Sequence, residues 1–192
     1  MTKTELYQSL NYVDATREKR TQMASLILDN PDLIHPLLEI VFEEKDPISN
    51  RASWVLEYTL KKKLHYIYPH LDFLTSNMSD VRLDSSVRPL AKICEFLAKA
   101  YFSKTKNEAQ KALQEKHLEA IAAACFDWLI GDYKVAAKAY SMTSLFLLGR
   151  KFDWVHPELK MVLEQNYGEG SPAYKARARM TLTKIDQETT ER

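Results

Sequence analysis

Glycine and cysteine are both scarce in this chain of 192 residues, which contains 4 glycines and 2 cysteines. A β-sandwich or a β-barrel needs many tight turns, and glycine builds most of them, so the shortage argues against both folds. Neither Cys94 nor Cys125 has a second cysteine or a histidine at the spacing of a zinc site, and each stands among apolar neighbours. We interpret both as buried free thiols, so the chain folds without disulfides or metal.

An excess of charge and a long apolar run are also missing. The 27 basic and 26 acidic side chains give a formal net charge of +1, so no overall field draws the chain to nucleic acid or to anionic lipid. Its first ten residues have no apolar core of the length that a secretory signal needs, and no window approaches the ~20 apolar residues that cross a bilayer. We expect a cytoplasmic protein that does not bind membranes.

Enzyme motifs are missing as well. The chain has no glycine-rich phosphate loop, no Gly-x-Ser-x-Gly turn, no dinucleotide fingerprint and no His-x-x-x-His or His-Glu-x-x-His pair. We therefore expect no catalytic residues, no metal site and no cofactor. What the chain has in quantity is apolar and charged residues, 45% and 28% of the total, which is the balance of a folded helical protein.

A motif around proline occurs three times without a gap, at 33–41, 66–74 and 154–162. In each copy, His or Tyr precedes the proline, and a leucine, a polar residue and two apolar residues follow it. Proline is tolerated in the first turn of a helix because its missing N–H would have no partner there, so each copy predicts the start of an amphipathic helix. The three prolines are 33 and 88 residues apart, and 88 residues is about two periods of ~44, within the range of helical-hairpin repeats.

Between these helices, an aspartate is followed after a few residues by a basic residue that opens another apolar helix. The pairs are Asp46 with Arg51, Asp84 with Arg88, and Asp132 with Lys138. Short polar side chains accept hydrogen bonds from the free N–H groups of a first helical turn, so we predict Ser49, Asn50 and Ser86 as N-caps. Because helix follows helix in this way, no segment is left as a candidate strand.

The two patterns together resemble those of the HEAT-repeat family, over roughly residues 16–187. The Pro-x-Leu-x-apolar-apolar helix and the Asp-x(3–5)-Arg/Lys-Ala start of the next helix both match that family. The resemblance implies an all-α fold, a right-handed α–α superhelix of about four to five helical hairpins. It also implies that the aspartate and the basic residue bond neighbouring repeats as a polar ladder.

The organisation that we expect is a single helical-repeat domain over 1–192, with 1–15 as an N-terminal cap and 168–192 as a C-terminal capping helix and tail. Within it, the apolar periodicity predicts ten helices. They span 3–11, 16–29, 32–44, 50–63, 66–78, 86–102, 109–130, 134–149, 155–166 and 172–187.

A stack of hairpins leaves a long open surface, which suits the binding of a partner better than enclosed chemistry. Our first hypothesis is a non-enzymatic scaffold or adaptor that binds a protein or a peptide with its concave helices. Trp54 lies beside Arg51 and Tyr58 on one helix, and an aromatic side chain among charged groups is a typical anchor. Packing inside the stack is the other interpretation of this tryptophan. The candidate binding residues are Arg51, Trp54, Tyr58, Arg88, Lys92 and Glu95.

A second hypothesis is the binding of DNA or RNA by basic side chains on the curved surface. It requires that the fold bring basic clusters together, as in the HEAT-like alkylpurine DNA glycosylases, which the chain resembles in architecture only. The clusters consist of Lys61, Lys62 and Lys63, then Lys99, Lys104, Lys106 and Lys111, and finally Lys175, Arg177 and Arg179.

A more remote hypothesis is an enzyme like adenylosuccinate lyase. The stretch from Ser85 to Lys92 resembles part of the Ser-Ser-x-Met-Pro-x-Lys-x-Asn motif of that superfamily, in which a mobile serine is the base. Arg88 stands in place of the methionine, the lysine comes one position late and the asparagine is missing. A homodimer stays open for any of these functions, because the open ends of a solenoid readily pair.

Overall fold

The computed structural model describes residues 1–43 and 47–190, and this part of the chain contains helices and no strand. The α-helices are α1 (Lys3–Leu10), α2 (Arg17–Asp29), α3 (Ile34–Phe42), α4 (Pro47–Lys62), α5 (Leu71–Asn77), α6 (Asp84–Tyr101), α7 (Ala109–Ala112), α8 (Glu115–Ile130), α9 (Val135–Leu148), α10 (Val155–Gln165) and α11 (Pro172–Thr190). Three short 3₁₀-helices are η1 (Pro31–Leu33), η2 (Leu64–His70) and η3 (Met78–Asp80). The predicted all-helical fold is confirmed for these residues.

The starts of two helices differ from the prediction. Ser49 and Asn50 are not N-caps, because α4 already begins at Pro47, and proline is favoured in a first helical turn. Ser86 is not an N-cap either, because α6 begins at Asp84 and Leu83 holds the capping position. The residue directly before α4 is Asp46, which lies outside the described residues.

Two predicted helices are each divided. The segment expected at 66–78 starts as the 3₁₀-helix η2, which contains Pro69, and continues as α5. The segment expected at 109–130 is interrupted at Leu113 and Gln114, both extended, so that α7 and α8 are separate. Gln114 is the N-cap residue of α8, and its N–H donates a hydrogen bond to the Nδ1 atom of His117 at 3.1 Å.

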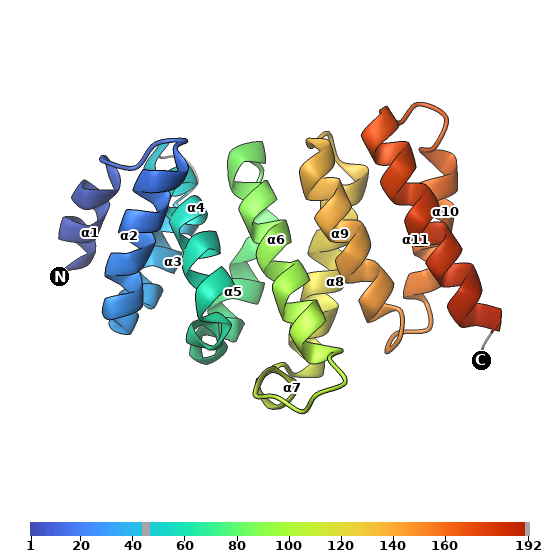
Figure 1. The fold of residues 1–192 in the computed structure, drawn as a ribbon, viewed down its shortest axis with the longest axis horizontal. Helices are drawn as coiled ribbons and strands as arrows, with labels where there is room; N and C mark the ends of the chain where they lie inside the picture. Colours follow the sequence, from blue (N-terminus) through green and yellow to red (C-terminus); the bar gives the residue numbers. More distant parts are fainter. Residues whose placement is uncertain (44–46, 191–192) are drawn as a thin grey trace.

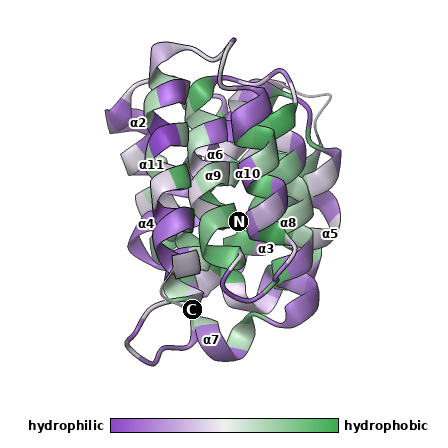
Figure 2. Ribbon diagram, turned by 90° about the vertical axis from the view of Figure 1, so that its right-hand side faces the viewer, coloured by the Kyte–Doolittle hydropathy of each residue, from purple (hydrophilic) through white to green (hydrophobic). Residues whose placement is uncertain are grey.

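The helices form two layers that follow the long axis of the molecule. A front layer consists of α2, α4, α6, α9 and α11, and a back layer consists of α1, α3, α5, α8 and α10 (Figure 1). Within the front layer each helix contacts the next one, and the hairpins α3–α4, α8–α9 and α10–α11 join the layers. The end view also separates α2, α4 and α11 on one side from α3, α5 and α8 on the other (Figure 2). Every front-layer helix runs in the same direction, so their N-termini share one edge and their C-termini the other (Figure 1).

The apolar core lies between these layers as one connected cluster that extends from Leu6 near the N-terminus to Ile185 in α11. A fully buried Leu or Ile side chain contributes about 1.5–3 kcal/mol. Trp128 of α8 is the largest side chain that is fully buried. Burial of apolar faces between successive helices is therefore what holds the two layers together.

Side chains of neighbouring elements also satisfy carbonyl groups that helix ends leave without a donor. The Tyr66 hydroxyl donates to the Leu28 carbonyl oxygen of α2 at 3.2 Å. The Nε2 atom of His156 lies 2.8 Å from the Phe146 carbonyl oxygen near the end of α9, and because a carbonyl only accepts, this nitrogen carries the proton. Gly149 passes so close to this imidazole that a Cβ atom would lie 1.9 Å from it.

Cys94 and Cys125 are both buried and both free, as the sequence predicted. The neighbouring Cys125 thiol and burial together raise the pKa of Cys94 well above its ordinary value. Since both thiols are buried in the core, we expect neither cysteine to react in the folded chain.

Candidate functional site

The six predicted binding residues lie on two adjacent helices of the front layer, α4 and α6. Arg51, Trp54 and Tyr58 come from α4, and Arg88 and Lys92 follow each other by one helical turn on α6. All five are partly exposed, whereas Glu95 is 5% exposed. The fold therefore gathers these residues on one face, but most of them already have partners in the chain.

Trp54 has a structural partner that the sequence did not predict. Pro89 lies inside α6 and has no N–H, so the Ser85 carbonyl, four positions earlier, lacks its helical donor. The indole N–H of Trp54 donates to this carbonyl at 3.1 Å. The guanidinium of Arg20 from α2 lies over the face of the ring, 4.5 Å from the ring centroid. Trp54 thus joins α2, α4 and α6 and stays partly exposed.

The Arg51 side chain contacts the C-terminal end of α1. Its guanidinium donates to the Asn11 carbonyl oxygen at 2.8 Å and lies 3.5 Å from the Leu10 carbonyl oxygen. A cation at a helix C-terminus also interacts favourably with the helix dipole. Arg51 therefore has a structural role, because it joins the end of α1 to α4, and its guanidinium is already engaged.

Arg88 forms a two-pronged ion pair with Glu57 across the α4–α6 contact. The Glu57 side chain is only 10% exposed and the Arg88 side chain 29%. A nearly buried carboxylate requires such a partner, because an unpaired charge in the interior is strongly destabilising. Glu57 was not among the predicted site residues, and no local pattern identifies a partner that lies 31 residues away.

Lys92 and Glu95 belong to a second charged cluster on α6. Glu95 accepts hydrogen bonds from Lys92 and, at 2.6 Å, from Lys99. Burial raises the pKa of Glu95, but the hydrogen bonds from the two lysines outweigh it and hold the pKa below its ordinary value. The Lys92 ammonium also lies 4.3 Å from the centroid of the Tyr140 ring on α9. Cations, carboxylates and aromatic rings thus alternate from α2 to α9 across the front layer.

The three predicted aspartate and basic pairs differ in their contacts. Asp84 does not pair with Arg88 but accepts a hydrogen bond at 2.8 Å from the N–H of Lys134, the N-cap residue of α9, and the Lys134 ammonium lies 3.4 Å away. Arg88 in turn bonds to Glu57 of α4. Asp46, the partner expected for Arg51, lies outside the described residues.

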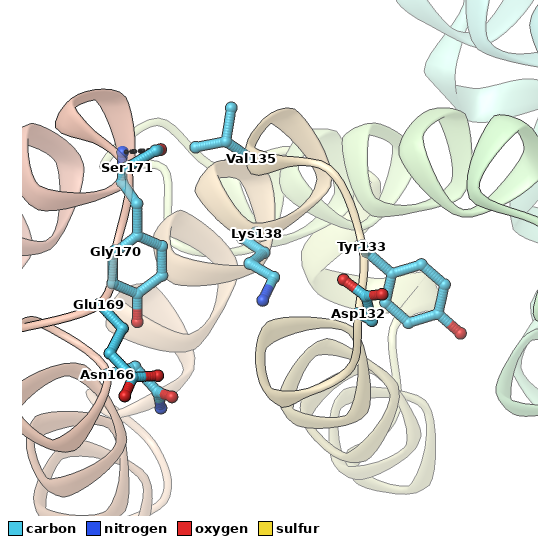
Figure 3. Close-up of a pocket in the computed structure, with 9 residues that line it drawn as sticks. Asp132, Tyr133, Val135, Lys138, Asn166, Glu169, Gly170 and Ser171 are labelled. Atoms are coloured by element: carbon cyan, nitrogen blue, oxygen red, sulfur yellow. Dashed lines mark hydrogen bonds between the residues drawn. The ribbon is translucent and has the colours of Figure 1, made fainter.

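The pair Asp132 and Lys138 borders a pocket of about 470 Å³ between the N-terminal ends of α9 and α11. Its lining residues are Asp132, Tyr133, Val135, Lys138, Asn166, Glu169, Gly170, Ser171 and Tyr174. In Figure 3 the Lys138 side chain reaches between Asp132 on one side and Glu169 with Asn166 on the other.

Two of the three basic clusters lie at the same edge of the molecule, and the third lies toward the opposite edge. Lys61 and Lys62 end α4, Lys99 lies in the last turn of α6, and α7 contacts η2, so the first two clusters share the edge where the front-layer helices end. The third cluster, with Lys175, lies in the first half of α11 and therefore toward the opposite edge.

A serine and a histidine, residue types that often take part in catalysis, have hydrogen-bond partners inside the fold. Ser86 is fully buried, and its hydroxyl donates to the Asn50 side-chain oxygen at 2.7 Å. His117 lies 2.8 Å from an Asp72 oxygen, but its second ring nitrogen accepts the Gln114 N–H, so both nitrogens are engaged. No group of three or more His, Cys, Asp or Glu side chains within 1–43 and 47–190 is placed to hold a metal ion.

No helix in the described part of the chain is long and apolar enough to cross a membrane. Comparison of the chain with protein-family models, with curated proteins and with solved structures gives no match. The contacts of the front-layer residues are therefore the basis for a functional proposal.

Proposed function

We propose that the chain is a non-enzymatic scaffold that binds a protein or peptide partner on the face of its front layer. The proposed architecture is a HEAT-like, right-handed superhelix of four to five hairpins, with this face on its concave side. Two features support that architecture: the front-layer helices all run in the same direction, and each contacts the next along the molecule. Such repeats bury their apolar sides against their neighbours and leave one long face open.

The observation that carries the proposal is the row of partly exposed cationic and aromatic side chains that their neighbours hold in place. Arg20 stacks on Trp54, Arg88 is held by Glu57, and Lys92 lies over Tyr140. Arg, Trp and Tyr are the residue types that dominate binding hot spots. Side chains already held by neighbours lose little conformational entropy when a partner binds, so a preformed row favours affinity.

Tyr58 is the residue that best tests this proposal. It is partly exposed next to Trp54, 5.9 Å from the Arg20 guanidinium, and its hydroxyl has no hydrogen bond within 1–43 and 47–190. The experiment is a pull-down from lysate of the source cell with tagged chain, treated with nuclease. We expect a stoichiometric protein partner that survives nuclease and is lost on Tyr58→Ala. The matched control is Trp154→Ala, which removes an aromatic ring, 52% exposed, that stacks on Phe126 of the back layer; loss of the partner only in this control would contradict the proposal.

A second candidate function is nucleic-acid binding at the edge where α4 and α6 end. It is favoured by the exposed lysines that the α7–η2 contact brings to this edge: Lys61, Lys62, Lys63, Lys104, Lys106 and Lys111. Phosphate contacts release counterions, so such binding weakens steeply with salt. Nucleic acid recovered without nuclease, together with a steep salt dependence that the joint replacement of Lys61, Lys62 and Lys63 by glutamine reduces, would favour this function over the first.

A further inference from the structure

The pocket between α9 and α11 is bordered by Asp132 and Lys138, one copy of the aspartate and basic motif. We call this copy open because its two charges have no partner of opposite charge in the described part of the chain, and we call the copy Asp84 with Arg88 closed because both of its charges have one. In the closed copy, Asp84 receives an N–H and an ammonium from Lys134, while Arg88 receives the carboxylate of Glu57. Both charges of that copy are thus satisfied by opposite charges of neighbouring elements. In the closed copy, the aspartate thus binds an N–H and an ammonium group, and the basic residue binds a carboxylate.

In the open copy, neither side chain has such a partner. The side chains of Asp132 and Lys138 make no ion pair and no hydrogen bond within residues 1–43 and 47–190, and neither does that of Glu169 across the pocket. The ammonium of Lys138 projects between the two carboxylates, which stand on different loops (Figure 3). Charges of both signs therefore border one pocket without neutralising each other.

A buried polar group on the pocket wall gives an independent indication. Tyr174 lines the pocket, is only 5% exposed, and its hydroxyl has no hydrogen-bond partner in the described part of the chain. Burial raises the pKa of this hydroxyl, so it stays protonated; the oxygen itself is covered by the pocket wall, so it donates to a ligand only after the covering side chains shift. Buried polar atoms are nearly always paired, and an exception calls for an explanation such as a bound water or ion. The residue stands in the first turn of α11, whose N-terminus favours negative charge.

We infer that this pocket binds a small zwitterion that carries both an ammonium and a carboxylate group, either a free amino acid or a short peptide. The carboxylate lies against Lys138 and the N-terminal end of α11, and the ammonium lies between Asp132 and Glu169. A simple anion would meet two carboxylates, and a simple cation would meet Lys138, so neither satisfies all three charges. The pocket volume of about 470 Å³ lies in the range of small-molecule sites. This inference does not depend on whether the front-layer face binds a partner.

The test is a titration of the ¹⁵N-labelled chain with each of the twenty free amino acids and with the dipeptide Ala-Ala, followed by NMR. Acetate and ethylammonium, which carry one charge each, are the reference compounds. We expect saturable shifts of the amides at 132–138 and 169–174 with at least one zwitterion, and weaker binding of both reference compounds. A response to amino acids alone identifies a metabolite site, and one to the dipeptide alone identifies a peptide site; either supports the inference.

Two lysine variants make the result specific. Lys138→Gln removes the ammonium from the pocket, and we expect at least about tenfold weaker binding, the effect of losing one charge-assisted hydrogen bond. Lys134→Gln changes a lysine just outside the pocket, whose side chain is 85% exposed, and we expect unchanged binding. Thermal unfolding of both variants checks that they fold. The inference is overturned if no probe shifts these amides at concentrations up to about 10 mM, if acetate binds as tightly as the best zwitterion, or if Lys138→Gln binds normally.

Discussion

Removal of the Trp54 indole N–H tests the role of this residue in joining α4 to α6. The Ser85 carbonyl depends on the indole because Pro89 has no N–H to donate, and the N–O distance is 3.1 Å. Trp54→Phe leaves this carbonyl without a donor, while an aromatic ring remains for the Arg20 guanidinium. An unpaired buried polar group costs about 1–3 kcal/mol, and we expect about 1–2 kcal/mol here, since Ser85 is only partly buried.

A double-mutant cycle separates this hydrogen bond from the lost volume of the indole ring. Pro89→Ala supplies an N–H at the position that donates to Ser85, so the carbonyl no longer needs Trp54. The smaller phenyl ring costs the same packing energy in either background. We therefore expect Trp54→Phe to destabilise the native sequence by about 1–2 kcal/mol more than it destabilises the Pro89→Ala variant, a difference of roughly 2–8 °C in Tm.

The assay is urea unfolding of the four proteins, followed by circular dichroism, with the free energy of unfolding extrapolated to water. Trp154→Phe is the matched control, because the same change on an exposed tryptophan should alter stability by no more than about 0.5 kcal/mol. Equal effects of Trp54→Phe in the two backgrounds would refute the reasoning, since the indole hydrogen bond would then contribute nothing.

Three further predictions concern other contacts. A thiol reagent should leave Cys94 and Cys125 unmodified in the folded chain and label both on unfolding, because both thiols are buried, and the neighbouring Cys125 thiol and burial raise the pKa of Cys94. Burial and the neighbouring His35 lower the pKa of His70, so the unfolded chain binds that proton more readily. Stability should therefore fall as the pH drops from about 7 to 5, and His70→Gln should reduce that fall in pH-dependent urea titrations. His117→Ala removes a buried ring that links α5 to α8, and we expect urea unfolding to show a loss of about 2–4 kcal/mol.

Apolar periodicity located most of the helices, because burial between two layers imposes the same spacing on each of them, but it did not give their ends or the change to a 3₁₀-helix at Leu64–His70. The break at Leu113 and Gln114 was missed, since neither glycine nor proline marks it and the helix start relies on a Gln–His pair. The sequence does not identify His117 as a capping residue, because its ring is held in place by Asp72 of α5, which is distant in the sequence.

The candidate binding residues were predicted to lie together, and α4 and α6, which carry them, are adjacent in the front layer. Their partners could not be predicted, because Arg88 meets Glu57 and Trp54 meets Ser85 across 31 residues, and only packing brings them together. For the same reason, the sequence pattern did not distinguish the satisfied Asp84 from Asp132, which stands in the open copy of the motif.

Site-specific photo-crosslinking in the source cell is the most direct test of the proposed scaffold function. A photoreactive phenylalanine analogue replaces Tyr58 on the front layer in one variant and Trp154 on the back layer in the other. We expect one protein to be crosslinked in high yield from position 58 and not from position 154. Crosslinks to nucleic acid from position 58, or the same proteins at similar yield from both positions, would contradict the proposal that the front layer is a protein-binding face.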